Sequence, residues 1–146
     1  MAQQKNVRDV MTPDPDCVSE RDSILDAARI MRDEDTGVVP VVDGKKVIGL
    51  ITDRDIVVRA IAEGKDINSI KVNEVMTKQV RSVREDNTVD EVLNLMSKAE
   101  IRRVPVVNSS NEIVGIVSIG DLSTRTTKDD KVGQTVERIS EAPPNN

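Results

Sequence analysis

The 146-residue sequence has no phenylalanine, tyrosine, tryptophan or histidine, and its single cysteine is Cys17. Without aromatic side chains the core has to be aliphatic, and no ring is available to stack on a ligand base. Without histidine, the usual zinc sites and the nucleophiles that need a histidine base are excluded. One cysteine cannot form an intrachain disulfide, which suits a reducing compartment. The sequence therefore predicts a cytoplasmic protein with no metal site and no catalytic residue.

The charge pattern also excludes some partners. The formal net charge is −5, whereas broad nucleic-acid binding usually needs a basic surface. A single-strand binder would also need aromatic stacking platforms. No apolar run approaches membrane-spanning length, and the opening MAQQKNVRDVM carries no apolar signal segment. We therefore expect neither a membrane nor a nucleic acid as partner.

The chain contains two copies of one pattern. VRDVMT at 7–12 recurs as VNEVMT at 72–77, and PVVDGKKVIGLITDRD at 40–55 recurs as PVVNSSNEIVGIVSIGD at 105–121. One such unit is too small to bury its apolar faces alone, so we expect the copies to pack about a pseudo-twofold axis. The predicted organisation is a first repeat at 7–61, a linker at 62–71, a second repeat at 72–123 and a polar tail at 124–146.

Each copy has the same predicted order of elements. Apolar residues at helical spacing begin at Ile24 and at Val89, and Thr88-x-x-Glu91 is a capping box that marks the second helix start. Two β-branched runs, Val38–Val42 and Val47–Ile51, flank an Asp-Gly turn signal and predict a hairpin. The pattern after Thr52 is helical again until Gly64. The predicted fold is α/β (α+β), with strand, helix, hairpin and helix in each repeat. The apolar spacing of Val132, Val136 and Ile139 would suit a short helix in the tail.

These repeats resemble the cystathionine-β-synthase (CBS) domain, and the tandem arrangement resembles a CBS pair, or Bateman module. The resemblance covers residues 7–122. It implies a stand-alone regulatory module that senses an adenine nucleotide, S-adenosylmethionine or an ion, although some similar modules have no known ligand. It also implies a homodimer formed through helices, an effector protein that the sequence does not identify, and no obligatory cofactor.

The Thr/Ser-x-x-Asp sequences that follow both hairpins have two explanations. A hydroxyl at the N-cap and an acid three residues later cap a helix, and this alone accounts for Thr52-x-x-Asp55 and Ser118-x-x-Asp121. The same helix start also favours an anion, and an aspartate there accepts hydrogen bonds from a ribose diol. In CBS domains that this sequence resembles, that aspartate is the ribose contact.

The resemblance implies two unequal sites, each joining the opening segment of one repeat to the hydroxyl and aspartate of the other. We favour the first, because Arg102 and Arg103 supply two cations for phosphate and Asp121 supplies the ribose contact. The second has Gly37 and Val38 at the position of the two arginines, and Arg54 is its cation. The favoured site comprises Thr12, Asp16, Cys17, Arg102, Arg103, Ser118 and Asp121, and the second comprises Gly37, Val38, Thr52, Arg54, Asp55, Thr77, Arg81 and Ser82.

Three classes of function follow from these residues. The first is a sensor that binds AMP, ADP or ATP between the repeats and signals through a change in conformation or in the dimer. The alternative is a structural or protein-interaction module without a ligand, in which both aspartates only cap helices. The third is an enzyme, which we set aside because the sequence offers no pair of nucleophile and base.

Overall fold

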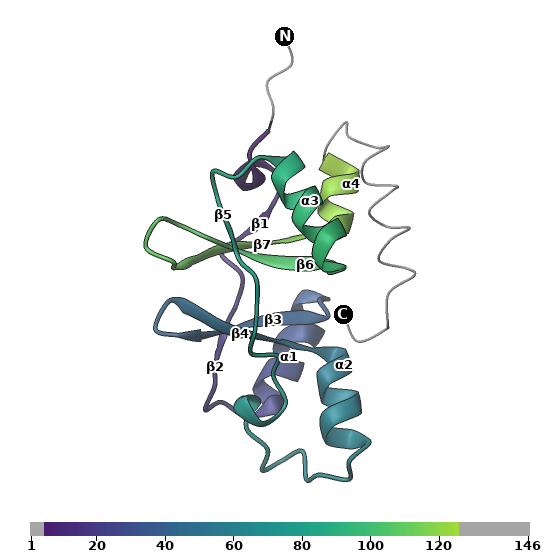
Figure 1. The fold of residues 1–146 in the computed structure, drawn as a ribbon. Coiled ribbons are helices and arrows are strands. Elements are labelled where there is room, and N and C mark those ends of the chain that lie inside the picture. The colour runs from purple at the N-terminus through teal and green to yellow at the C-terminus, as the bar shows by residue number, and fades with distance from the viewer. Residues whose placement is uncertain (1–4, 126–146) are drawn as a thin grey trace. The chain divides into compact units, whose positions relative to one another are not determined.

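The computed structural model describes residues 5–125, and the predicted tail helix lies outside them. The chain divides into two compact units (Figure 1). Unit 1 combines residues 5–14 with residues 81–125, and unit 2 is formed by residues 15–80. The fold is mixed α+β, with one sheet in each unit. No helix in this described part of the chain is long and apolar enough to cross a membrane.

Unit 2 is built on a three-stranded sheet with the order β2-β3-β4. Strands β3 and β4 form an antiparallel hairpin, and β2 runs parallel to β3. The bounds of its elements are β2 (Val18–Ser19), α1 (Ile24–Glu34), β3 (Val38–Asp43), β4 (Lys46–Thr52), α2 (Asp53–Ile56), the π-helix η2 (Val57–Ile61) and the 3₁₀ turn η3 (Val72–Glu74).

Unit 1 repeats this arrangement on a four-stranded sheet with the order β1-β7-β6-β5. The hairpin of β6 and β7 is antiparallel, β5 is parallel to β6, and β1 is antiparallel to β7. The bounds of its elements are the 3₁₀ turn η1 (Val7–Asp9), β1 (Thr12–Pro13), β5 (Val83–Arg84), α3 (Val89–Ala99), β6 (Arg103–Val107), β7 (Ile113–Ser118) and α4 (Ile119–Arg125).

The two hairpins and the helices before them form where the sequence predicted them. Gly44 takes a positive φ of 65°, as the Asp-Gly turn between β3 and β4 requires. The predicted capping box is confirmed, because Thr88 Oγ1 accepts from Glu91 N at 3.2 Å and Glu91 Oε1 accepts from Thr88 N at 3.3 Å. The apolar side of α3 is buried at Val89 and Met96. Helical period and capping chemistry therefore place α3 as expected.

The helix after the first hairpin differs from the regular helix that the sequence predicted. The chain makes one α-helical turn, α2, and continues as the π-helix η2. Ala62 N then donates to Val57 O at 2.8 Å, five residues back, and Gly64 takes a positive φ of 71° near the helix end. Within this π-helix Ala60 is fully buried, whereas Ile61 beside it is 54% exposed. A regular helical period in the sequence does not reveal such a widening.

The opening segment of each repeat packs into the unit that holds the hairpin of the other repeat. In unit 1, Val7 N donates to Asn87 O at 2.8 Å, and Val7 and Val10 are fully buried in the core around α3. In unit 2, Val72 N donates to Asp22 O at 2.8 Å, and Val72 lies in the core around α1. The two repeats thus exchange their first residues, and each core is completed by a distant part of the sequence.

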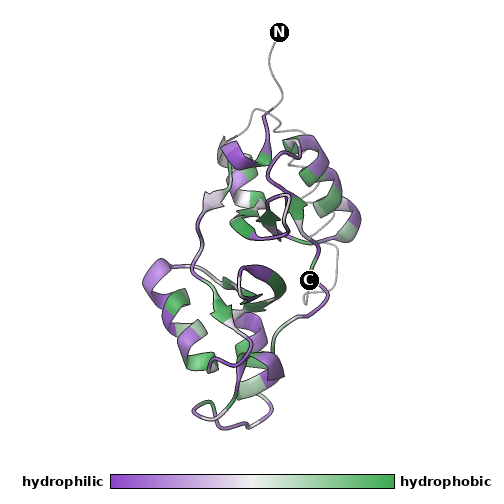
Figure 2. Ribbon diagram, turned by 90° about the vertical axis from the view of Figure 1, so that its left-hand side faces the viewer, coloured by the Kyte–Doolittle hydropathy of each residue, from purple (hydrophilic) through white to green (hydrophobic). Residues whose placement is uncertain are grey.

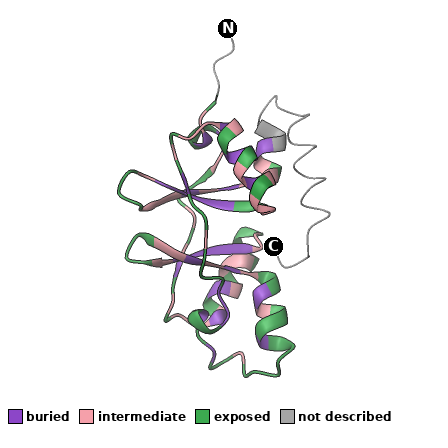
Figure 3. Ribbon diagram, in the orientation of Figure 1, coloured by how far each residue is buried: buried purple, intermediate pink, exposed green. Residues whose placement is uncertain are grey.

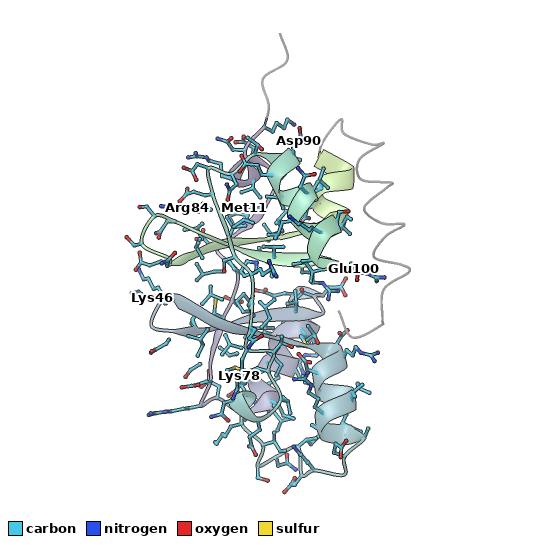
Figure 4. The ribbon with its side chains drawn as sticks, viewed as in Figure 1. Met11, Lys46, Lys78, Arg84, Asp90 and Glu100 are labelled. Carbon is cyan, nitrogen blue, oxygen red and sulfur yellow. The ribbon has the colours of Figure 1, made fainter. Side chains whose placement is uncertain are left out.

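A glycine in each hairpin allows this exchanged segment to approach closely. In unit 2, Leu50 N donates to Thr77 O at 3.0 Å and Thr77 N donates to Leu50 O at 2.8 Å. A Cβ atom on the preceding residue, Gly49, would lie 2.6 Å from Thr77 O. In unit 1, Gly115 pairs with β1, and the space that a Cβ would need is occupied by the side chain of Met11. Figure 4 labels Met11 in unit 1. Only glycine fits at either crossing without a shift of the opening segment.

Both cores are aliphatic, as the absence of aromatic residues requires. The helices turn apolar stripes inward and polar residues outward (Figure 2), and the hairpin strands are buried along much of their length (Figure 3). The side chains that are essentially inaccessible include Leu93, Met96 and Leu122 in unit 1 and Ile24 and Ile51 in unit 2. Close packing of branched side chains therefore supplies the apolar burial of each unit.

Candidate functional site

The favoured candidate residues of the second repeat gather at one end of the β6–β7 hairpin in unit 1. Arg103 is the register partner of Ser118, and Ile119 N donates to Arg102 O at 2.9 Å. Both arginines are exposed, and Asp121 is half-buried. Two cations and one carboxylate therefore lie around the point where β7 passes into α4.

The hydroxyl and carboxylate of this group cap α4. Ser118 N donates to Asp121 Oδ2 at 3.0 Å, and Asp121 N donates to Ser118 Oγ at 3.1 Å. These reciprocal bonds are the capping arrangement that the sequence predicted. Thr12 belongs to the same unit, because β1 pairs with β7 and places Thr12 opposite Ile116, two residues before Ser118. Part of the favoured set is thus assembled within unit 1.

The second candidate set has the same framework in unit 2. Val38 is the register partner of Thr52, and Asp53 N donates to Gly37 O at 3.0 Å, as Ile119 does to Arg102. Thr52 N donates to Asp55 Oδ2 and Asp55 N donates to Thr52 Oγ1, both at 3.0 Å. Thr77 is brought to this hairpin by its bridge to β4. The two hairpin ends are therefore structurally equivalent.

Charge distinguishes the two hairpin ends. Where unit 1 has Arg102 beside Ile119, unit 2 has Gly37 beside Asp53. The Asp53 carboxylate lies over the glycine, since a Cβ at Gly37 would be 3.0 Å from Asp53 Oδ2. This carboxylate also accepts from the backbone N–H of Arg54 at 2.8 Å. A phosphate would therefore meet cations in unit 1, whereas an acid stands at the same place in unit 2.

Arg59, which no sequence motif indicated, contacts both the Asp55 carboxylate and the opening segment in unit 2. Its Nε lies 3.7 Å from Asp55 Oδ1, and its Nη1 donates to the carbonyls of Val75 and Met76, at 3.3 Å in each case. Asp55 is 8% exposed, so most of its carboxylate surface is already covered within the unit. The i,i+4 spacing of Asp55 and Arg59 could have indicated the pair, but the contact with the opening segment depends on long-range packing.

Four predicted site residues lie in the other unit from the residues they were grouped with. Asp16 and Cys17 belong to unit 2, and Arg81 and Ser82 belong to unit 1. Within unit 2, Cys17 Sγ donates to Pro15 O at 3.3 Å. Burial, reinforced by Asp16 and Glu34, raises the pKa of the Cys17 thiol to about 11. A hydrogen bond with Asp16 raises the pKa of the Glu34 carboxyl above its ordinary value. Cys17 is therefore a protonated thiol at neutral pH.

Metal ligands do not cluster in the described residues. No group of three or more histidine, cysteine, aspartate or glutamate residues within 5–125 is arranged to hold a metal ion. The Asp16 and Glu34 carboxyls form a pair through a hydrogen bond, and two oxygen-bearing side chains fall short of the six to eight oxygen ligands that Ca²⁺ takes.

Comparison with known proteins places this architecture in a family. The family model of the CBS domain matches residues 7–61 and 72–126. An uncharacterized protein of Bacillus subtilis, YlbB, is 41% identical over 92% of this chain and 91% of its own length. Hypoxic response protein 1 of Mycobacterium tuberculosis is 36% identical over 80% of this chain and 81% of its own length.

Solved structures show the same fold. The structure of Hypoxic Response Protein I with two coordinated zinc ions matches with a TM-score of 0.75 and 34% identity, over 83% of this chain and 98% of that one. The CBS domain pair of protein MJ0100, in complex with 5-methylthioadenosine and S-adenosyl-L-methionine, matches with a TM-score of 0.73 and 36% identity, over 82% and 98% of the two chains.

The duplicated sheet and helix unit, with a capped helix start after each hairpin, therefore defines a tandem CBS architecture. The chain belongs to the CBS-domain family, and its two repeats form a CBS pair.

Proposed function

We propose that this CBS pair is a regulatory module that binds an adenine nucleotide and has no catalytic activity of its own. The observation that carries the proposal is the set of Arg102, Arg103, Ser118 and Asp121 at one end of the β6–β7 hairpin. The arginines supply charge-assisted hydrogen bonds for phosphate, and the Asp121 carboxylate accepts from a ribose diol. The adenosine compounds bound by the MJ0100 CBS pair support this ligand class.

Electrostatics favours unit 1 over unit 2 as the site of nucleotide binding. Arg102 and Arg103 have no cationic counterpart at Gly37 and Val38, and Asp53 would repel a phosphate there. Thr12 is placed beside this hairpin by β1. Asp16 and Cys17 remain predicted members of the favoured site, and Gly37, Val38, Thr52, Arg54, Asp55, Thr77, Arg81 and Ser82 remain predicted members of a second, weaker one.

Binding is to be measured by titration calorimetry with AMP, ATP and S-adenosyl-L-methionine. Because the chain has no aromatic residue, an adenine absorption band in the purified protein would also report a retained ligand directly. Replacing Arg102 with alanine should raise the dissociation constant for AMP about tenfold to a hundredfold, as expected for the loss of a charge-assisted hydrogen bond. The matched control is Arg32→Ala, an exposed arginine that pairs with Asp33 in unit 2.

The variant Asp121→Ala separates a ligand contact from a cap. Asp55→Ala removes the equivalent capping bonds of unit 2 together with the Arg59 contact, so it reports how lost stability alone affects binding at the unit 1 site. Loss of AMP binding in Asp121→Ala but not in Asp55→Ala would support the proposal. Equal binding in both variants and in the wild type would show that Asp121 only caps α4.

A ligand-free interaction module is the second candidate, and the capping bonds themselves favour it. Both carboxylates are already engaged by backbone N–H groups, so neither needs a ligand to explain its presence. This module would show no heat of binding with AMP, ATP or S-adenosyl-L-methionine. In either case we propose a homodimer that signals to an effector protein, and the cytoplasmic location stays a prediction.

A further inference from the structure

The two carboxylate oxygens of Asp55 face different neighbours. Oδ2 accepts the capping hydrogen bond from Thr52 N at 3.0 Å, and Oδ1 lies 3.7 Å from Arg59 Nε. The Asp55 side chain is nearly buried, whereas the Arg59 side chain is half exposed. A carboxylate at such depth is costly without a counter-charge, and Arg59 supplies one. One oxygen therefore serves the helix cap, and the other faces the arginine.

Arg59 extends the same guanidinium to the opening segment of the second repeat. Its Nη1 donates to Val75 O and to Met76 O, at 3.3 Å in each case. Both of these residues are buried, so a carbonyl left without a donor there would be costly. The planar fork of an arginine spreads its donors over three nitrogens, whereas a lysine concentrates them on one. Arg59 thus joins the Asp55 carboxylate to the opening segment.

The opening segment held in this way leads directly out of unit 2. Thr77 exchanges two backbone hydrogen bonds with Leu50 of β4, and unit 2 ends at Val80, three residues later. From there the chain continues to β5 of unit 1 (Figure 1). The contacts of Arg59 therefore lie a few residues before the point where one unit passes into the other.

The sequence of the second repeat keeps the residue types of this arrangement. Asp-x-x-x-Arg at 55–59 recurs at 121–125, and Val-Met of the opening segment at 75–76 recurs at 10–11. The two residues before the arginine are not kept, because Val-Val in the first repeat becomes Ser-Thr in the second. An arginine that only carried charge into solvent would be as free to change as these neighbours. Its recurrence favours a role that both repeats share.

We propose that Arg59 is a positioning residue that couples the Asp55 carboxylate to the packing of the opening segment at residues 72–77. A ribose diol that hydrogen-bonds to Asp55 would compete for the oxygen that faces Arg59, so the hold of Arg59 on the two carbonyls would weaken. The ligand would thereby loosen the segment that leads into unit 1. This consequence rests on nucleotide binding at the second predicted site, whereas the coupling itself is a property of the ligand-free protein.

A double-mutant cycle in the ligand-free, full-length protein tests the coupling, with amide hydrogen exchange of residues 72–77 as the readout. Asp55→Asn keeps an oxygen for the cap but removes the charge, and it should speed this exchange severalfold. Arg59→Ala should speed it about tenfold or more, as expected when hydrogen bonds from a charged donor are lost. In the Arg59→Ala background, Asp55→Asn should add nothing further. An equal effect of Asp55→Asn with and without Arg59 would overturn the proposal.

Two further variants separate this coupling from a general loss of stability. Arg29→Ala removes an exposed arginine that lies 3.7 Å from Asp26 on α1, and it should leave the exchange of residues 72–77 unchanged. Arg59→Lys keeps the charge without the fork, so exchange should stay faster than in the wild type, and this variant replaces Arg59→Ala in the cycle if the latter does not fold. Full recovery by lysine, or equally faster exchange throughout α1, would contradict the proposal.

Adenosine tests the consequence for signalling, because it carries the ribose diol without a phosphate for Asp53 to repel. The Asp121→Ala background removes the ribose contact predicted for unit 1. In this background adenosine should speed the exchange of residues 72–77, and after Arg59→Lys calorimetry should still detect binding while the exchange no longer responds. Binding without any change in exchange would contradict the release of Arg59. Absence of binding would count against the nucleotide site in unit 2, whereas the cycle would still decide the role of Arg59.

Discussion

The exchange of opening segments predicts that replacing Gly49 with alanine destabilises unit 2. The added Cβ would lie 2.6 Å from Thr77 O and 3.2 Å from the Met76 sulfur. The sulfur belongs to a flexible side chain that can move, but Thr77 O is a backbone atom whose hydrogen bond with Leu50 N fixes it at 3.0 Å. The opening segment therefore has to shift away from β4.

The magnitude follows from what that shift removes. The two hydrogen bonds between Leu50 and Thr77 each contribute about 1 kcal/mol. Strain from an extra methyl group in a packed region adds about 1–3 kcal/mol. Alanine recovers about 0.5–1 kcal/mol by restricting the unfolded chain. We expect the free energy of unfolding to fall by roughly 2–4 kcal/mol in total.

Urea denaturation, followed by far-ultraviolet circular dichroism, measures this loss, since no aromatic fluorescence is available. The control is Gly120→Ala, where the nearest atom to a Cβ, Ser118 Oγ, is 3.5 Å away. That helical position should tolerate alanine or gain up to about 1 kcal/mol. If Gly49→Ala unfolds at the same urea concentration as Gly120→Ala, the close approach does not hold the opening segment.

Four further outcomes follow from the described contacts. With its pKa raised from 9.0 to about 11, the Cys17 thiol should react slowly with a disulfide reagent in the native protein at pH 8 and much faster in urea; equal rates would show that the thiol is not shielded. The pKa of this thiol is higher in the folded than in the unfolded protein, so its contribution to stability is complete below pH 9 and is lost between about pH 9 and 11. A series of urea titrations at increasing pH should show this loss in the wild type and not in Cys17→Ser. Thr88→Ala removes the cap of α3 and should cost about 1 kcal/mol in thermal or urea unfolding, and an unchanged midpoint would show that the cap is dispensable. Arg59→Ala breaks the contacts with Val75 and Met76 and leaves the Asp55 carboxylate without its cation. We therefore expect faster amide hydrogen exchange in residues 72–77. Arg59→Lys should restore the charge but not both carbonyl contacts.

Local chemistry explains which elements could be predicted from the sequence. The hairpins follow from β-branched runs around an Asp-Gly turn, and α3 follows from its period and from Thr88 and Glu91. The capping bonds of Asp55 and Asp121 could also be predicted, because a cap depends on residues only three positions apart. Such patterns concern neighbours in the chain, and tertiary packing here leaves them intact.

Long-range contacts account for what the sequence did not reveal. The contacts of Arg59 with the carbonyls of Val75 and Met76 join residues 16 and 17 positions apart. The π-helical turn at Val57–Ile61 has no counterpart in the apolar spacing, which predicted a regular helix. The Asp53 carboxylate lies beside Gly37 because Asp53 N donates to Gly37 O, a contact that the sequence does not indicate. The sequence already indicated that the two sites differ in their arginines, whereas the carboxylate that lies over Gly37 became evident only from the position of Asp53.

The exchanged opening segments also bear on how this architecture can be divided. A fragment that starts at residue 72 would keep its own VNEVMT but lack residues 5–14, whose Val7 and Val10 fill the core around α3. An isolated repeat would have to take such residues from another molecule to complete its core. In the tandem chain the covalent link supplies both opening segments, so completion of each core does not depend on protein concentration.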